Sequence, residues 1–164
     1  MLFTRNSKRF DRRIFLSGLA ALAGCGFEPV YAPGNQAHKL RGRIEVAEPA
    51  DEEGFALVRR LEDRLGQASS GDLTLNAEIL IDEEAVGFLP DGSISRYNVL
   101  GEVSWSLSDS SGPQLSGGER SFTSYSATST TVATIVAQRN ARERLMIVLA
   151  DRIVADILAG ADAL

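Results

Sequence analysis

The fold is decided by the stretch LTLNAEILID, residues 73–82. Apolar side chains occupy its odd positions from Leu73 to Ile81, and polar ones such as Thr74 and Glu78 lie between them. A period of two is the pattern of a strand that buries one face and leaves the other in water. The stretch therefore predicts a half-buried β-strand, and the other elements can be placed around it.

Two more strands are predicted after a connection at residues 85–94. The first carries large side chains on one face, and we expect the aromatic ones to lie in the core: Tyr97, Val99, Val103, Trp105 and Leu107. Gly101 lies on the same face, which favours a bulge or a place beneath a large neighbour. Turn formers at residues 109–113 close a hairpin with a weaker strand at 115–125, whose serines and glycines offer little to pack.

A short strand and a helix are predicted upstream of residue 73. Leu40, Ile44 and Val46 alternate with charged residues, as in a half-buried strand, and Pro49 ends the run. Carboxylates at residues 51–53 then lie where the free N–H groups of a helix point. Apolar side chains follow at helical spacing as far as a terminating glycine: Phe55, Val58, Leu61 and Leu65.

A longer amphipathic helix is predicted from about Thr130 to Leu158, with Gly160 as its terminator. Its apolar side includes Ile135, Leu145, Leu149, Ile153 and Ile157. On its solvated side, Arg139 and Glu143 have the spacing of an ion pair within one helix. The element order is β-α-β-β-β-α, which predicts an α+β two-layer sandwich. In it, two helices pack on one face of a four-stranded, mostly antiparallel sheet.

The N-terminus has the pattern of an export signal. Basic side chains precede the apolar run 14–23, which is too short to cross a ~30 Å hydrocarbon core as a helix. The sequence Leu22-Ala23-Gly24-Cys25 follows, and it resembles the lipobox of bacterial lipoproteins. We therefore expect a signal peptide at 1–24, lipidation of Cys25, a tether at 25–37 and one domain at 38–164. The Arg12-Arg13 pair leaves both the general and the twin-arginine export routes open.

The charge of the domain excludes one class of partner. The signal holds five of the 17 basic residues and one of the 22 acidic ones, which leaves 12 basic and 21 acidic, a formal charge near −9. Nucleic-acid binders need clustered Lys and Arg for phosphate contacts, so nucleic acid is not expected as a partner. Cys25 is the single cysteine, so no disulfide is expected.

Few residues suggest catalysis. His38 is the only histidine and lies at the end of the expected tether, where a catalytic or metal-binding role is not expected. The carboxylate runs at 51–53 and 82–84 fall at expected element ends, where solvated acidic residues are common. No glycine-rich phosphate loop is present. The sequence therefore predicts no enzyme, no cofactor and no metal site.

Several short motifs resemble one family when they are taken in order. Gly26, Phe27, Pro29 and Tyr31 follow the lipobox cysteine, and further motifs stand at 95–99, at 124–125 and along 133–153. Together they resemble the alphaproteobacterial form of LptE, the lipopolysaccharide-assembly lipoprotein family. The resemblance implies a protein on the periplasmic face of the outer membrane, attached through its lipid. It also implies that the protein plugs the β-barrel LptD, helps it fold and contacts lipopolysaccharide in transit.

The resemblance also suggests contact residues. Because Lys39 is the single lysine after residue 24, contact with an anionic lipid would fall to arginines, with Arg96 and Arg120 as candidates. Phe88 and Leu89, in the connection at 85–94, are candidates for insertion into a barrel or a lipid. The alternative interpretation is an auxiliary lipoprotein of a periplasmic lipid-transport ABC system, which would also carry a lipobox and an α/β domain.

Overall fold

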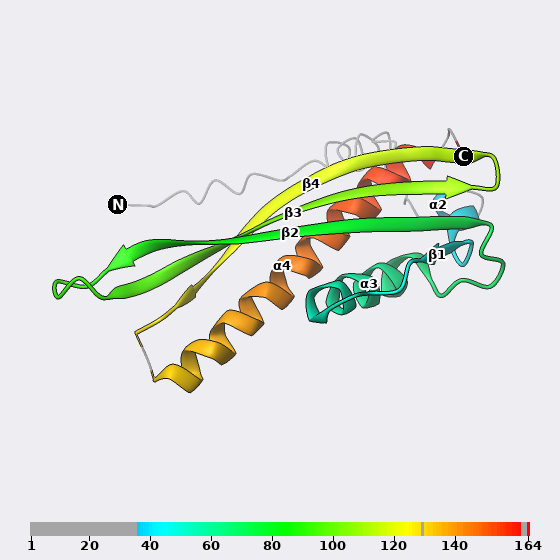
Figure 1. Cartoon of the computed structure of the whole chain (residues 1–164). Coiled ribbons are helices and arrows are strands. Elements are labelled where there is room, and N and C mark those ends of the chain that lie inside the picture. The colour runs from blue at the N-terminus through cyan, green and yellow to red at the C-terminus, as the bar shows by residue number, and fades with distance from the viewer. Residues whose placement is uncertain (1–35, 129, 162–163) are drawn as a thin grey trace, which may run out of the picture.

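The computed structural model describes residues 36–128, 130–161 and 164 (Figure 1). Cys25, the expected signal peptide and most of the expected tether lie outside these residues. The described elements follow in order: α2 (Gln36–Leu40), β1 (Ile44–Val46), α3 (Glu52–Leu65), β2 (Leu73–Phe88), β3 (Ile94–Asp109), β4 (Gly112–Ser126) and α4 (Thr131–Ala159).

The strands form one sheet in the order β1-β2-β3-β4. β1 pairs with β2 in parallel, and the other two pairings are antiparallel. Figure 1 shows α3 and α4 lying against the same face of the sheet. The predicted α+β two-layer sandwich is confirmed, with a short additional helix, α2, at the N-terminal end of the described chain.

The β2–β3 hairpin is longer than the sequence predicted. Its pairing continues from Thr74 opposite Ser108 to Phe88 opposite Ile94, with register shifts on either side of Gly87. Residues 85–88 therefore belong to β2, and the connecting turn is confined to 89–93. The far end of this hairpin projects beyond the helices (Figure 1).

The N-terminal strand is shorter than predicted. Leu40 is buried, but it ends α2 and does not begin a strand. Gly42, at φ 76°, turns the chain and donates its N–H to the carbonyl of Leu65 at 3.0 Å. The strand proper covers only Ile44–Val46. Proline has no N–H for a sheet ladder, so Pro49 prevents a longer β1.

The buried row of α3 differs from the predicted one. It consists of Gly54, Leu57, Leu61 and Leu65, whereas Phe55 is 60% exposed and Val58 is half-buried. A Cβ on Gly54 would lie 3.3 Å from Pro49, so the segment before the helix covers it at this glycine. Phe55 lies one position, about 100°, away from that row and faces outward.

Two glycines on the helix-facing side of the sheet leave room for large side chains. A Cβ on Gly101 would lie 2.9 Å from Leu145 of α4, and a Cβ on Gly117 would lie 2.8 Å from the ring of Trp105. The expected place of Gly101 beneath a large neighbour is thus confirmed. Trp105 is buried, as predicted.

The sequence overestimated the core at the start of α4. Ile135, predicted to lie on the apolar side, is 54% exposed, whereas Leu145, Leu149, Ile153 and Ile157 are fully buried. Figure 1 shows the reason, since the first turns of α4 extend past the beginning of α3.

Candidate functional site

The tip of the β2–β3 hairpin presents apolar side chains to solvent. Phe88 is 64% exposed and Leu89 is 41% exposed. The turn is held by Asp91, whose Oδ1 accepts from the N–H of Ser93 at 2.9 Å and from its hydroxyl at 2.7 Å. These hydrogen bonds hold the pKa of Asp91 below its ordinary value. The tip is therefore an ordered turn with an apolar surface, where insertion into a partner would cover Phe88 and Leu89.

The candidate arginines of the sheet do not form one site. Arg96 is exposed on β3 and pairs with Ser126, whereas Arg120 pairs with Glu102, six residues further along β3. Six residues of strand span about 20 Å. The Arg120 side chain, 78% exposed, donates from Nη2 to Oε1 of Glu102 at 2.6 Å. The sheet therefore carries two separate cationic side chains, of which Arg120 already forms an ion pair with Glu102.

The expected Arg139–Glu143 pair within α4 is wrong. Arg139 instead pairs with Glu52 of α3 at 2.9 Å, and Glu143 lies 4.0 Å from Arg59 of the same helix. Because α3 lies beside α4, it offers opposite charges to both side chains. Arg144 points to β4, where it donates to the carbonyl of Ser124 at 3.3 Å.

A half-buried polar cluster joins both helices to the sheet. Arg142 of α4 donates from Nη1 to Glu53 of α3 at 2.9 Å and from Nη2 to Glu83 of β2 at 2.8 Å. The same Glu83 carboxylate accepts two bonds from Gln138 and one from the hydroxyl of Tyr125, each at 2.9 Å. The side chains of Glu53 and Glu83 are only 19% and 18% exposed.

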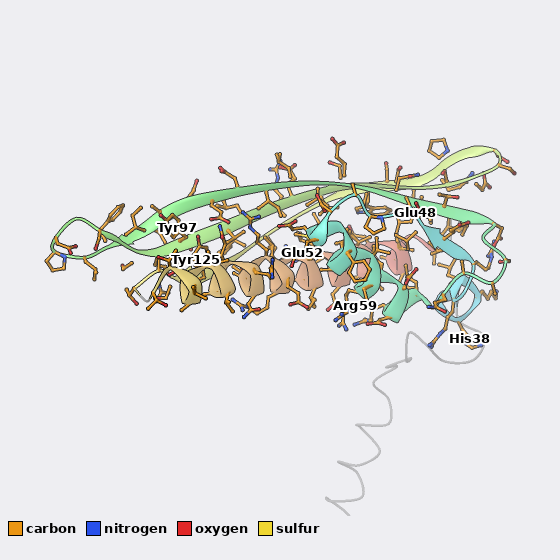
Figure 2. The ribbon with its side chains drawn as sticks, turned by 60° about the horizontal axis from the view of Figure 1, so that its bottom comes forward. His38, Glu48, Glu52, Arg59, Tyr97 and Tyr125 are labelled. Atoms are coloured by element: carbon orange, nitrogen blue, oxygen red, sulfur yellow. The ribbon has the colours of Figure 1, made fainter. Side chains whose placement is uncertain are left out.

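Aromatic stacking completes this cluster. The rings of Tyr97 and Tyr125 are 5.3 Å apart and 14° from parallel. Figure 2 shows the two rings side by side between the sheet and α4, while His38 lies far from them on α2. We refer to Glu53, Glu83, Tyr97, Tyr125, Gln138 and Arg142 as the Arg142 cluster.

The hydrogen bonds of the Arg142 cluster hold the two helices and the sheet together. Burial by itself raises the pKa of Glu83, but the hydrogen bonds from Arg142, Gln138 and Tyr125 outweigh it and keep that pKa below its ordinary value. Burial and the bond to Glu83 raise the pKa of Tyr125 to about 12. A carboxylate that already accepts from three side chains is a poor general base.

The cluster corrects one prediction from the sequence. The runs at 51–53 and 82–84 were expected to be solvated, but Glu53 and Glu83 are the least exposed partners in the described ion pairs. The sequence feature that could have predicted the burial of Glu83 is its odd position, which it shares with the buried Leu73 and Leu75 of the same strand.

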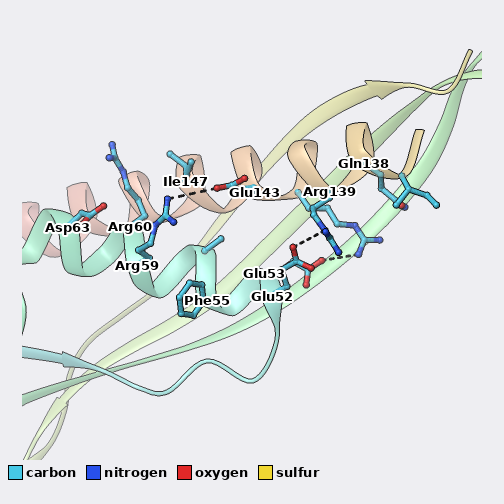
Figure 3. A pocket seen from close by; sticks show the side chains of 13 residues that line it. Glu52, Glu53, Phe55, Arg59, Arg60, Asp63, Gln138, Arg139, Glu143 and Ile147 are labelled. Carbon is cyan, nitrogen blue, oxygen red and sulfur yellow. Dashed lines mark hydrogen bonds and ion pairs between the residues drawn. The ribbon is translucent and has the colours of Figure 1, made fainter. Parts of the chain in front are cut away.

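A groove of about 390 Å³ lies between α3 and α4 beside this cluster (Figure 3). Phe55, Ile135 and Ile147 supply its apolar lining, and the ion pairs Glu52–Arg139 and Arg59–Glu143 cross it. Within the part of the chain that the structure describes, no group of three His, Cys, Asp or Glu side chains could hold a metal ion. The same part contains no helix with the length and apolar character needed to cross a membrane.

These features define a small α+β scaffold domain with a projecting apolar hairpin, in which the half-buried ionisable groups hold the layers together. The chain belongs to the LptE lipopolysaccharide-assembly family, whose sequence profile matches residues 42–157. The resemblance noted in the sequence is thereby confirmed. A search of the curated proteins found no match.

Solved structures of low sequence identity share the fold. A candidate lipoprotein from Caulobacter crescentus superposes with a TM-score of 0.63 at 20% identity, over 77% of this chain and 96% of that one. The rare lipoprotein B of Shewanella oneidensis gives 0.54 at 14% identity, over 71% and 92% of the two chains. Lipoprotein B of Nitrosomonas europaea gives 0.56 at 12% identity, over 75% and 86%.

Proposed function

We propose that this chain is a non-enzymatic outer-membrane lipoprotein that acts in lipopolysaccharide assembly as the plug and folding partner of an LptD-like β-barrel. The family match over residues 42–157 carries the proposal. It favours this function over that of an auxiliary subunit of a lipid-transport ABC system. Two lipoprotein B structures with the same fold add support at the level of architecture.

The shape of the domain suits a plug. The outward face of the sheet is mainly polar, with residues such as Asn76, Glu78 and Ser104 around the exposed Leu80 and Phe122, which suits the wet interior of a barrel. The projecting hairpin adds an apolar tip, and we propose Phe88 and Leu89 as contacts with the barrel or with lipid.

Membrane attachment is proposed to come from acyl chains on Cys25. A single acyl chain binds a membrane only marginally, so several chains on one cysteine are needed for a stable anchor. The protein would then lie on the periplasmic face of the outer membrane. Arg96 and Arg120 are proposed as separate contacts with lipopolysaccharide phosphates, since guanidinium groups match phosphate geometry.

The proposal is tested by depleting the protein and following the barrel and the cell surface. We expect loss of mature barrel and of surface lipopolysaccharide, and restoration of both by the wild-type chain. Restoration by a variant carrying Phe88→Ser and Leu89→Ser should be weaker. Phe55→Ser, which alters an aromatic side chain of similar exposure (60%) on α3, away from the hairpin tip, is the matched control. Normal barrel maturation and lipopolysaccharide display in depleted cells would contradict the assembly role.

A further inference from the structure

The two edges of the sheet differ in how they are covered. On β4, side chains of α4 reach the edge: Arg152 donates to the carbonyl of Arg120, and Arg144 donates to that of Ser124. On the opposite side, β1 pairs only with residues 73–75 of β2. Because Pro49 follows so soon, no strand of the described residues neighbours the edge of β2 beyond this point.

The free backbone groups of this edge can be identified from the hydrogen bonds of β1. The N–H of Leu73 donates to Arg43 and the carbonyl of Leu75 accepts from Ala47, so odd residues of β2 face that side. By the alternation of an antiparallel ladder, Ile79, Ile81, Glu83 and Ala85 direct their N–H and C=O groups away from β3. We call residues 79–85 the open edge.

The described residues provide little to satisfy the open edge. The N–H of Glu83 donates to the carboxylate of the preceding Asp82 at 2.9 Å. This local hydrogen bond takes the place of one to a neighbouring strand. No backbone hydrogen bond from a described residue outside the β2–β3 ladder reaches the other groups. An exposed strand edge is a template for adding a strand from another chain.

The acidic side chains of β2 indicate which kind of strand would fit beside its open edge. β2 contains Glu78, Asp82, Glu83 and Glu84 and no basic residue. Glu78, Asp82 and Glu84 are exposed on the outer face, whereas Ile79 and Ile81 are half-buried on the helix-facing side. A second copy of β2 would bring its own carboxylates against these three, which disfavours pairing of the chain with itself.

We propose that the open edge of β2 binds an extended segment of a partner protein in which basic and apolar side chains alternate. The basic side chains lie beside Glu78, Asp82 and Glu84, and the apolar ones lie beside Ile79 and Ile81. The backbone of the segment pairs with the outward groups of residues 79–85. This site is separate from the hairpin tip and does not depend on the identity of the barrel.

The test uses the protein as cells produce it, in detergent micelles, and a synthetic peptide of five Lys-Val repeats. At about 1 mM peptide we expect exchange of the Ile79, Ile81 and Ala85 amide hydrogens to slow by about tenfold. The control peptide has the same side chains but carries N-methyl groups on the residues that would donate to the edge, and it should give no protection. Absence of slowing, or equal slowing by both peptides, would overturn the proposal.

Charge reversal separates edge pairing from general attraction between the acidic domain and a basic peptide. The triple variant Glu78→Lys, Asp82→Lys, Glu84→Lys should lose protection by the Lys-Val peptide and gain it from a Glu-Val peptide. The matched control Asp63→Lys, Glu143→Lys, Asp156→Lys changes the net charge equally on exposed helix positions and should keep the wild-type preference. If both variants switch preference alike, or if these amides are protected by self-association without peptide, the proposal fails.

Discussion

The guanidinium of Arg142 lies 2.8 Å from the carboxylate of Glu83, although the two residues are 59 positions apart in the chain. The same guanidinium reaches Glu53 of α3 at 2.9 Å. One side chain of α4 thus connects the other helix and the second strand. Its partners are the least exposed carboxylates of the described ion pairs, so replacing Arg142 leaves acidic groups that water only partly solvates.

Replacement of Arg142 by methionine should destabilise the domain. We expect a loss of about 1–3 kcal/mol, less than for a fully buried pair because the Arg142 side chain is partly exposed. Urea denaturation followed by circular dichroism measures the difference. Arg139→Met, which breaks an exposed pair with Glu52, should cost no more than about 1 kcal/mol. Equal losses for the two variants would refute a special role for Arg142.

The stability of the domain should depend on the ionisation of Glu83. Its pKa is lowered on folding, so its contribution is present above the unfolded pKa of about 4.3 and is lost as the pH falls through the folded pKa. The difference in unfolding free energy between the wild type and Glu83→Gln should therefore shrink between pH 7 and pH 3. Glu84→Gln, at an exposed neighbouring position, serves as the control. A difference that stays constant over this range would contradict the prediction.

Two adjacent glycines of β4 should respond differently to a methyl group. Gly117→Ala places a Cβ 2.8 Å from the Trp105 ring, whereas the nearest atom to a Cβ on Gly118 is 3.9 Å away. We expect Gly117→Ala to cost about 1–3 kcal/mol through overpacking and Gly118→Ala to change stability by less than about 0.5 kcal/mol. Because Trp105 is the single tryptophan, its fluorescence reports both the unfolding midpoint and any shift of the indole.

Membrane attachment should depend on the thiol of Cys25. If this thiol carries the acyl chains, Cys25→Ser removes the anchor and moves most of the protein from the membrane fraction to the soluble periplasmic fraction. Fractionation with immunodetection measures this, and mass spectrometry of the wild-type N-terminus identifies the modification. A serine variant that still sediments with membranes would show that another contact attaches the protein.

Much of the fold could be predicted because its patterns are local. The alternation at residues 73–82 and 97–107 and the helical spacing after Leu145 reflect burial on one face, and the structure confirms those faces. The errors lie where a neighbouring element changes the outcome. Phe55 is exposed because α3 buries the row that begins at Gly54, and Ile135 is exposed because α4 begins beyond the start of α3.

The sequence by itself determined the order of the elements, the parity of the strands, the family resemblance and the expected lipid attachment at Cys25. The elements, the strand parity and the lipobox depend on residues close together in the chain, and the resemblance depends on short local motifs taken in order. Only the tertiary structure decided that Arg142 joins Glu53 and Glu83, that Arg139 pairs across helices and that the described strands leave the open edge of β2 unpaired. Ion pairs and strand edges depend on which distant segments become neighbours, and the period of a single segment carries no such information.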